Sequence, residues 1–330
     1  MFASNKTIVI ADGYQEQSGL PVEAAAGEHG LQDTELILKQ KPGVSEEFSV
    51  PLPKNVKAEN VVVENRYTDR ELWIYIKSED IGFYEENEIF GDISPIQSGC
   101  GEVREDGILL KLRMNHVLEY KSTMEGNVLT FVCYRPEELY EFIVVLDPEG
   151  GGNDTGYSGS ELVEKDLTLQ VARLVQKNLA APAVRLYLTR TEDIDVPEQD
   201  RVQFTKEVNA DCYICLGAEF DRENAEIYGI RSSYNEEYFI PGFGNANLAD
   251  TVTKAVTIAA SNRALGLYAA EEDSILKSLE TRGVRISLGY LSNLKEGTLL
   301  AQESYQEKLA EGIVKAITEA CDTLRSMKNE

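Results

Sequence analysis

A glycine-rich, acidic loop is the first segment of this sequence whose residue types could do chemistry. It reads Asp147-Pro-Glu-Gly-Gly-Gly-Asn-Asp154, follows the apolar run Phe142–Leu146 and precedes a stretch with helical period. Glycine-rich turns between a strand and a helix can bind phosphate through their backbone N–H groups. This loop lacks a Gly-Lys-Ser/Thr ending and contains neither Lys nor Arg, and Glu149 at its centre would repel phosphate. Nucleotide binding is therefore not expected.

Two cysteines, Cys212 and Cys215, have the spacing of redox and metal-binding Cys-x-x-Cys motifs. The surrounding segment, Asp211–Leu216, predicts a strand, on which side chains three residues apart point to opposite faces. We therefore interpret both cysteines as small core residues. The two histidines of the chain, His29 and His116, both precede residue 140.

From Phe142 onward, short apolar strands alternate with helical stretches, and these elements must position the loop. We expect strands at 142–146, 184–189, 212–216 and 284–288, and helices at 162–179, 200–208, 247–260 and 305–327. Such alternation is typical of an α/β fold. The sequence predicts a mixed twisted sheet flanked by helices over residues 141–330.

The earlier part of the chain has a different pattern. Residues 51–140 contain segments rich in β-branched and aromatic residues, including Glu71–Lys77 and Val128–Tyr134, and Glu125-Gly126-Asn127 is a hairpin turn signal. They predict a small all-β module, sandwich-like, which could target the chain to a cell wall. Residues 1–50 show no sustained period and are expected to be only partly ordered.

The charge of the chain excludes several partners. With 57 acidic and 32 basic residues, the formal net charge is −25. Nucleic-acid binding requires a basic surface, so we expect no nucleic-acid partner. No apolar run approaches the ~18 residues that a membrane-spanning helix needs. No membrane-spanning segment is expected in this chain.

Six short blocks, in this order over about 150 residues, resemble the zinc-dependent N-acetylmuramoyl-L-alanine amidase family, the type 3 cell-wall hydrolases. The blocks are Leu146-Asp-Pro148, Gly151-Gly-Asn-Asp-Thr-Gly156, Val163-Glu-Lys-Asp166, Leu188-Thr-Arg190, Arg201 with Val208-Asn-Ala-Asp211, and Leu288-Gly-Tyr-Leu-Ser-Asn293. The resemblance implies the amidase fold for residues 141–330. Arg190 and Arg201 are interpreted as structural ion-pair residues, and Asn293 as a turn or cap residue.

In that family two histidines and a glutamate hold zinc, and a further glutamate acts as general base and acid. By the resemblance, the two histidine positions are occupied here by Gly150 and Gly217, and the catalytic glutamate position by Ser287. Only the ligand Glu164 is kept. Structural zinc sites have four ligands, and catalytic ones three with an open position for water. We therefore predict no catalytic residues and no bound zinc.

Acidic residues stand beside both lost histidine positions. Glu149 precedes Gly150, and Glu219 follows Gly217 by two residues, a spacing that returns to the same face of a strand. Glu149, Glu164, Glu219 and Ser287 are therefore candidates for lining a remodelled groove. The three carboxylates could alternatively hold a hard cation such as Ca²⁺ or Mg²⁺, or they could simply reflect the acidity of the chain.

Three functions remain open at this stage. The first is a pseudoenzyme of the cell envelope that binds peptidoglycan fragments or an envelope protein through this groove. The second is an active N-acetylmuramoyl-L-alanine amidase that hydrolyses peptidoglycan with a non-standard metal site, and the third is a purely structural scaffold. Because the family acts outside the cytoplasmic membrane, we expect an extracellular or cell-envelope location. The chain would be secreted or membrane-anchored by a targeting segment that this sequence lacks.

Overall fold

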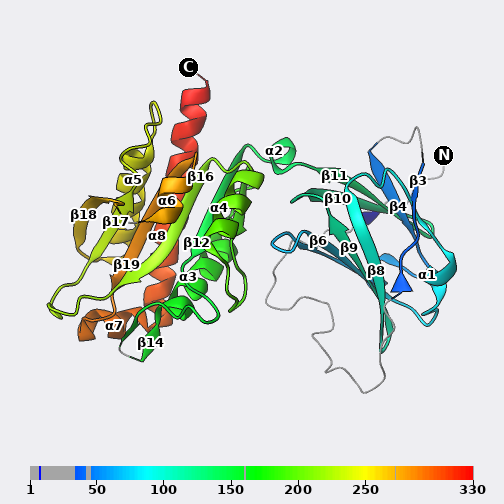
Figure 1. Ribbon diagram of the computed structural model, residues 1–330, viewed down its shortest axis with the longest axis horizontal. Coiled ribbons are helices and arrows are strands. Elements are labelled where there is room, and N and C mark those ends of the chain that lie inside the picture. The colour runs from blue at the N-terminus through cyan, green and yellow to red at the C-terminus, as the bar shows by residue number, and fades with distance from the viewer. Residues whose placement is uncertain (1–6, 9–33, 42–45, 160, 272, 330) are drawn as a thin grey trace. The chain divides into compact units, whose positions relative to one another are not determined.

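The structure is a computed structural model (Figure 1), and it describes residues 7–8, 34–41, 46–159, 161–271 and 273–329. The chain divides into two compact units, Met1–Leu139 and Tyr140–Glu330. Each unit has a hydrophobic core of its own. Among the helices of the described residues, none is long and apolar enough to cross a membrane.

The first unit is built from two sheets whose neighbouring strands are mostly antiparallel. Their strand orders are β1-β10-β11-β4-β7-β3 and β2-β8-β9-β6-β5. The elements are β1 (Thr7–Ile8), β2 (Thr34–Glu35), β3 (Leu38–Gln40), β4 (Glu47–Pro51), η1 (Ala58–Asn60), β5 (Val61–Arg66), β6 (Glu71–Lys77), α1 (Phe83–Glu86), β7 (Ile89–Gly91), β8 (Ile96–Arg104), β9 (Gly107–Met114), β10 (Glu119–Glu125), β11 (Val128–Tyr134) and α2 (Pro136–Leu139). Side chains from both sheets pack in one core.

The alternation of apolar residues explains this packing. In β5, Val61 and Val63 are buried while Val62 between them is half-buried, as the two-residue period of a strand requires. The turn expected at residues 125–127 joins β10 to β11, whose register pairs Glu125 with Val128. The strands β1, β2 and β3, and all of β4 except Pro51, lie within residues 1–50 and belong to the two sheets. The other residues expected to be partly ordered, 1–6, 9–33 and 42–45, lie outside the described residues.

The second unit is a six-stranded mixed sheet with helices. Its strand order is β15-β12-β16-β19-β17-β18, in which β15, β12, β16 and β19 are parallel and β17 is antiparallel to β19. The elements are β12 (Phe142–Pro148), β13 (Ser158–Gly159), β14 (Leu162–Val163), α3 (Glu164–Asn178), β15 (Val184–Leu188), α4 (Glu198–Glu207), β16 (Cys212–Glu219), β17 (Ile230–Tyr234), α5 (Asn245–Ala260), β18 (Ala264–Ala269), α6 (Ser274–Ser278), β19 (Arg282–Tyr290), α7 (Leu294–Leu300) and α8 (Glu303–Lys328). The predicted fold class is confirmed.

The two faces of this sheet have different contents. On one face, alternate strand residues such as Val144, Ile214 and Ile286 join side chains of α3, α5 and α8 in the main core. The residues between them point to the opposite face. There, α4 contacts α6, and the rings of Tyr187 and Phe204 meet edge to face at 5.7 Å. That second face carries the candidate site.

The strands predicted from the sequence are present, while β17 and β18 were not predicted. The sequence Ile230–Tyr234 contains two serines and an arginine, and Ala264–Ala269 is largely exposed, so neither has a clear apolar signal.

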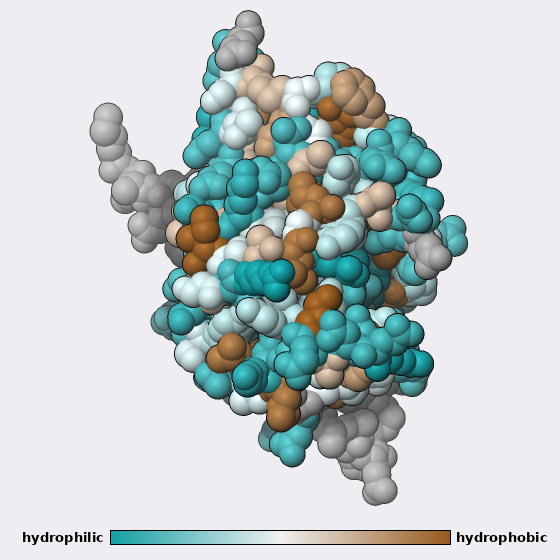
Figure 2. Space-filling view, turned by 90° about the vertical axis from the view of Figure 1, so that its left-hand side faces the viewer, coloured by the Kyte–Doolittle hydropathy of each residue, from teal (hydrophilic) through white to brown (hydrophobic). Residues whose placement is uncertain are grey.

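On the side of the second unit seen in Figure 2, hydrophobic residues are scattered among mainly hydrophilic ones. Asn293 caps α7, as expected, because its side chain accepts hydrogen bonds from the N–H groups of Lys295 and Glu296.

Candidate functional site

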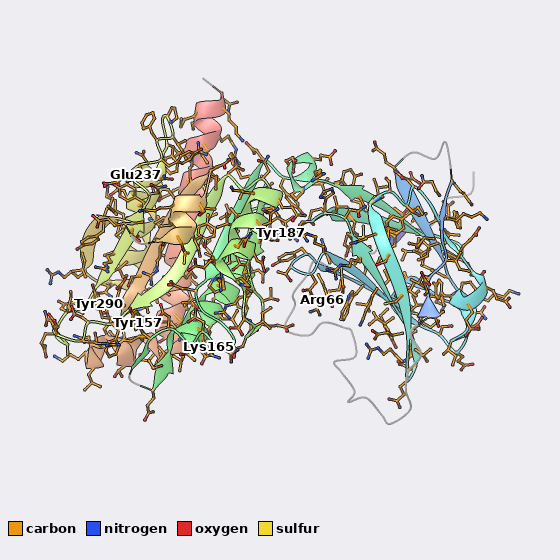
Figure 3. The ribbon with its side chains drawn as sticks, in the orientation of Figure 1. Arg66, Tyr157, Lys165, Tyr187, Glu237 and Tyr290 are labelled. Atoms are coloured by element: carbon orange, nitrogen blue, oxygen red, sulfur yellow. The ribbon has the colours of Figure 1, made fainter. Side chains whose placement is uncertain are left out.

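The glycine-rich loop lies at the carboxyl end of β12, the sheet edge at which the parallel strands β16 and β19 also end. Tyr157 and Lys165 lie at this end of the unit in Figure 3, together with Tyr290 of β19. Gly150, Gly151 and Gly152 have φ angles of +77°, +125° and +56°. Only glycine adopts such angles readily, so the tight path of the loop depends on this run.

Two buried arginines bind backbone carbonyl groups of the loop. Arg201 forms an ion pair with Asp147 and donates to the carbonyl oxygen of Gly150 at 2.9 Å. Arg190 is fully buried and donates to the carbonyl oxygens of Pro148 at 2.9 Å and Lys165 at 2.8 Å. Because buried carbonyl groups require partners, these bonds fix the backbone of the loop. Arg201 thus forms the ion pair expected from the sequence, whereas Arg190 supports the loop through backbone carbonyl groups.

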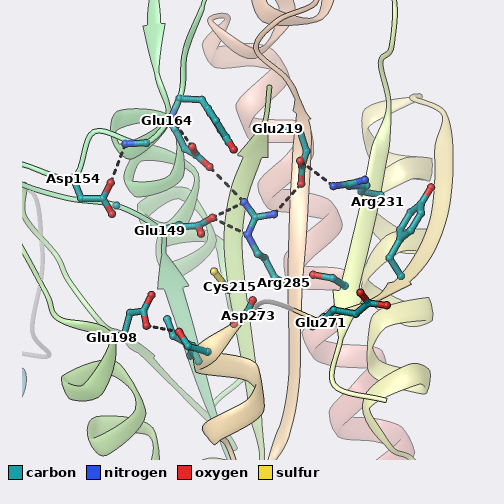
Figure 4. Close-up of a pocket in the computed structure, with 18 of the residues that line it drawn as sticks. Glu149, Asp154, Glu164, Glu198, Cys215, Glu219, Arg231, Glu271, Asp273 and Arg285 are labelled. Atoms are coloured by element: carbon teal, nitrogen blue, oxygen red, sulfur yellow. Dashed lines mark hydrogen bonds and ion pairs between the residues drawn. The ribbon is translucent and has the colours of Figure 1, made fainter. Parts of the chain in front are cut away.

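A third arginine, Arg285 of β19, occupies the centre of the site (Figure 4). Its Nε and Nη2 atoms lie 2.8 and 2.7 Å from the same carboxylate oxygen of Glu149. Its Nη1 atom donates to Glu219 at 3.0 Å, and Nη2 also donates to the carbonyl oxygen of Ala218 at 3.2 Å. Arg231 donates to the other oxygen of Glu219 at 3.0 Å. The guanidinium group is thus shared between a carboxylate of the loop, Glu149, and one at the end of β16, Glu219.

The third carboxylate of the cluster is Glu164, the first residue of α3, and it is 2% exposed. One oxygen accepts the N–H of Tyr157 at 2.8 Å, and the other accepts the N–H of Ala218 at 2.6 Å. The Nη2 atom of Arg285 lies 3.7 Å from the oxygen that accepts the N–H of Ala218. Since both oxygens already accept backbone hydrogen bonds, Glu164 ties the start of α3 to the loop and to β16.

Burial and charge act against each other in this cluster. Burial raises the pKa of Glu149, although the neighbouring Arg285 opposes this. Burial, with a smaller contribution from the charge of Glu149, raises the pKa of Glu164 to about 7. Burial lowers the pKa of Arg285, but the charges of Glu149 and Glu219 outweigh it and raise that pKa well above its ordinary value. Arg285 is therefore a permanent positive charge in the site.

The other positions that the resemblance assigns to the zinc ligands and the catalytic glutamate are Gly150, Gly217 and Ser287. Gly217 lies in β16, where an added Cβ would overlap both the carboxylate of Glu149 and the guanidinium of Arg285. An added Cβ at Gly150 would lie 2.9 Å from the carbonyl oxygen of Asp154. Ser287 is 1% exposed, and its hydroxyl donates to the carbonyl oxygen of Gly289 at 3.4 Å.

These residues do not fit a zinc ion. Zinc sites in proteins use nitrogen, sulfur and carboxylate donors from at least three side chains. Glu164, to which the resemblance assigns a ligand role, has both oxygens engaged with backbone N–H groups, and Arg285 places a positive charge 3.7 Å from one of them. Within the part of the chain that the structure describes, no group of three or more His, Cys, Asp or Glu side chains is arranged to hold a metal ion.

The acidic residues chosen from the sequence do converge, but on Arg285 rather than on one another. The expected alternative, a Ca²⁺ or Mg²⁺ site formed by Glu149, Glu164 and Glu219, would place its cation where the guanidinium lies. The sequence reasoning missed Arg285. A signal was available, because Arg285 precedes Ser287 by two residues and therefore shares its face of β19.

A cleft of about 940 Å³ opens above this cluster. It is lined by Glu149, Gly150, Asp154, Gly156, Tyr157, Glu164, Glu198, Tyr213, Cys215, Glu219, Arg222, Arg231, Ser233, Tyr268, Ala269, Ala270, Glu271, Asp273, Ser274, Ile275 and Arg285. This volume lies in the range of small-molecule binding sites. The lining offers carboxylates, guanidinium groups and two exposed tyrosine rings, those of Tyr157 and Tyr268. Such a surface can bind a polar ligand with amide and charged groups.

The two cysteines of the Cys-x-x-Cys spacing point to opposite faces of β16, as strand geometry predicts. Cys212 packs in the main core, whereas Cys215 lines the cleft. Both thiols are free and buried, and burial raises the pKa of each. A raised pKa keeps the thiols protonated and unreactive.

Comparisons with known proteins give consistent results for the second unit. Residues 144–319 match the family described as N-acetylmuramoyl-L-alanine amidase. The chain is 30% identical over 197 residues to the germination-specific N-acetylmuramoyl-L-alanine amidase of Bacillus subtilis strain 168, an alignment covering 53% of this chain and 78% of that protein. It is 27% identical over 176 residues to the probable cell wall amidase LytH of Staphylococcus aureus, covering 52% of this chain and 55% of LytH.

Solved structures agree with the sequence matches. The N-acetylmuramoyl-L-alanine amidase of Clostridium difficile 630 superimposes with a TM-score of 0.52 and 27% identity, covering 55% of this chain and 97% of that one. The catalytic domain of CwlV from Bacillus (Paenibacillus) polymyxa var. colistinus gives a TM-score of 0.51 and 25% identity, covering 55% and 99%.

Proposed function

Because the chain belongs to the N-acetylmuramoyl-L-alanine amidase family, we propose that it is a catalytically inactive member, a pseudoenzyme of the cell envelope that binds peptidoglycan fragments through its cleft. One observation carries this proposal. The guanidinium of Arg285 lies between Glu149, Glu164 and Glu219, beside the positions that the family resemblance assigns to the metal ligands. The guanidinium of Arg285 therefore occupies the space that a bound metal ion would need.

The chemistry of amide hydrolysis supports inactivity. When bound in an active amidase, zinc polarises the scissile carbonyl and lowers the pKa of its water. Here Gly150 and Gly217 offer no ligand atoms, and the guanidinium would repel a divalent cation. Ser287 cannot act as general base at neutral pH, because a hydroxyl binds a proton too weakly, and this one is buried and donates to Gly289. The residues at the assigned positions therefore supply neither component of the family mechanism.

The supported loop and open cleft favour binding over a scaffold role. The backbone of the loop is held by Arg190 and Arg201, which fixes the cleft wall before any ligand arrives. A wall fixed in advance costs less entropy on binding. The relatives are named for cleavage beside muramoyl-alanine groups, and peptidoglycan fragments carry the amides, carboxylates and amines that this lining can pair with. The envelope location follows from the same family role.

Isothermal titration with a soluble muropeptide tests the proposal, with mass spectrometry of the mixture after incubation with added Zn²⁺. We expect saturable binding, with the muropeptide recovered intact. Arg231→Met should weaken binding, because it removes a guanidinium that lines the cleft, whereas Lys206→Met in the exposed pair with Glu280 should not. Cleaved product would instead support an active amidase with a non-standard metal site. If no heat of binding is measured at millimolar muropeptide, the purely structural scaffold is the function that remains.

A further inference from the structure

Two tyrosine rings line the cleft and are exposed in it. Tyr157 follows the glycine-rich loop (Figure 3), and Tyr268 belongs to β18. Each of the two residues is 44% exposed. An aromatic ring in contact with water forgoes the free energy that burial of its apolar faces would release. Because these two rings are exposed within a concave site, they are candidates for contact with a ligand.

A second side chain holds each ring in place. The ring of Tyr157 stacks on that of Phe220, with centroids 5.9 Å apart and an interplanar angle of 24°. The guanidinium carbon of Arg231 lies 5.0 Å from the ring centroid of Tyr268, and the Tyr268 hydroxyl donates to the carbonyl oxygen of Leu265 at 3.0 Å. Since these contacts restrict the rings before a ligand arrives, binding against them costs less conformational entropy.

The sugars are the part of a peptidoglycan fragment that matches such rings. The stem peptide carries methyl groups, carboxylates and amines, but no aromatic side chain. The pyranose rings of the glycan have equatorial substituents, so their faces present C–H groups, which stack on aromatic faces. Their hydroxyl and acetamido groups point outward and need hydrogen-bonding partners. Asp154, Arg222 and Glu271 line the same cleft and offer them.

The charge of the cleft also favours the sugars. Its lining contains more carboxylates than guanidinium groups. Two of its arginines, Arg231 and Arg285, are already paired with Glu219, and Arg285 is also paired with Glu149. A cleft lined mainly by one sign of charge repels ligand groups of that sign. The carboxylates of a stem peptide therefore meet repulsion, whereas N-acetylated sugars carry no charge.

We propose, on the basis of the function proposed above, that Tyr157 and Tyr268 bind pyranose rings of the glycan. The cleft then takes muropeptides that keep their disaccharide in preference to free stem peptides. The two tyrosines determine this specificity, because they contact the part of the ligand that distinguishes the two fragments.

Isothermal titration with a soluble disaccharide muropeptide, and with the same stem peptide without sugars, tests this inference. We expect the disaccharide form to bind at least about tenfold more tightly. Tyr157→Ala and Tyr268→Ala should each weaken its binding about tenfold and leave the affinity for the free peptide nearly unchanged. Tyr157→Phe keeps the stacked ring and should bind nearly as tightly as the native protein.

Tyr228→Ala is the matched control. Tyr228 is 46% exposed and has the guanidinium carbon of Arg263 5.9 Å from its ring centroid, but it is not among the residues that line the cleft. Its removal should leave both affinities unchanged. Circular dichroism checks that each variant is folded.

Equal affinity for the two fragments would overturn this inference and leave the proposed function standing. Folded Tyr157→Ala and Tyr268→Ala variants that bind the disaccharide form normally would also overturn it. So would variants that lose affinity for both fragments by the same factor, since the rings would then support the cleft rather than contact sugars. If neither fragment binds the native protein, the proposed function fails together with this inference.

Discussion

Two groups of residues in the site, a lower layer beneath the loop and an upper layer facing the cleft, differ in how closely they follow the motifs of the family. The lower layer, Asp147 with Arg190 and Arg201, lies in matching sequence blocks and forms a buried network beneath the loop. The upper layer faces the cleft, and there the positions that the family resemblance assigns to two ligands and the base are Gly150, Gly217 and Ser287. The support of the loop follows the family motifs, while the proposed function requires that the groups for the chemistry are replaced.

The difference shows that the shape of the loop and its chemistry depend on separate residues. The lower layer satisfies buried backbone carbonyls and would be costly to lose in any protein with this fold. The upper layer needs only to balance its own charges, and Arg285 does so for Glu149 and Glu219. Under the proposed function, the support of the loop is kept while the groups that hydrolyse the amide are absent.

The largest expected effect comes from breaking the lower layer. Asp147→Ala leaves the guanidinium of Arg201 buried without its carboxylate and removes the acceptor of two hydroxyl groups, those of Thr189 and Tyr213. Breaking a buried pair by removing one partner typically costs about 3–5 kcal/mol. Urea denaturation should show this loss. Glu280→Ala, which removes an exposed pair with Lys206, should change stability by less than about 1 kcal/mol.

The upper layer should make stability depend on pH. Because the pKa of Glu164 is raised from 4.5 to about 7 in the folded state, the native protein holds a proton that the unfolded chain has released between these values. The free energy of unfolding should therefore fall as pH rises from about 4.5 to 7, by up to roughly 3 kcal/mol. Glu149 and Asp273, whose pKa values burial also raises, act with the same sign.

The variant Glu164→Gln isolates this contribution. It should flatten the fall in stability between pH 4.5 and 7, whatever its effect on stability at a single pH. Glu271→Gln alters an exposed carboxylate of the cleft and should leave the slope unchanged. An unaltered slope in Glu164→Gln would show that Glu164 does not carry a raised pKa.

The next largest effect on stability is expected from removing Arg285, the cation at the centre of the site. Arg285→Met leaves Glu149 and Glu219 without their shared partner and should cost about 2 kcal/mol, as is typical for hydrogen bonds to charged groups. Adding Glu149→Gln and Glu219→Gln should recover much of the loss. The melting temperature of the native protein should be indifferent to millimolar Ca²⁺, whereas that of Arg285→Met should rise. A Ca²⁺ response in the native protein would contradict the role given to Arg285.

The smallest effect is expected at Gly217. A methyl group there would overlap the ends of the Glu149 and Arg285 side chains, both of which can shift, so Gly217→Ala should cost about 1 kcal/mol. Gly126→Ala provides a contrast, since an added Cβ there meets nothing within 4 Å and only its positive φ is strained. If Arg285 does not lie against Gly217, the substitution will be neutral.

Sequence patterns predicted the second unit well because its central strands are buried on both sides and read as continuous apolar runs. Phe142–Pro148 is buried at every residue, and such a segment leaves little doubt about its structure. The pattern failed for Ile230–Tyr234 and Ala264–Ala269. These strands lie towards the edge of the sheet, where partial exposure removes the apolar signal.

For the site, the sequence predicted that Glu149, Glu164 and Glu219 converge, but not that Arg285 joins them. Arginine is common on protein surfaces, and Arg285 lies outside the matched motif blocks, so its two-residue spacing from Ser287 on β19 was the one signal that pointed to it. Its partners come from the loop after β12 and from β16, at a distance of more than 60 residues along the chain. Such a contact follows from strand order, which short-range patterns do not encode.

The most direct test of the pseudoenzyme proposal is elemental analysis of the purified chain after equilibration with Zn²⁺ and removal of excess metal. We predict no stoichiometric zinc, because Arg285 supplies the positive charge of the site and two ligand positions are glycine. About one tightly held zinc per chain, lost together with muropeptide cleavage in Glu164→Ala, would contradict the proposal and identify the protein as an active amidase.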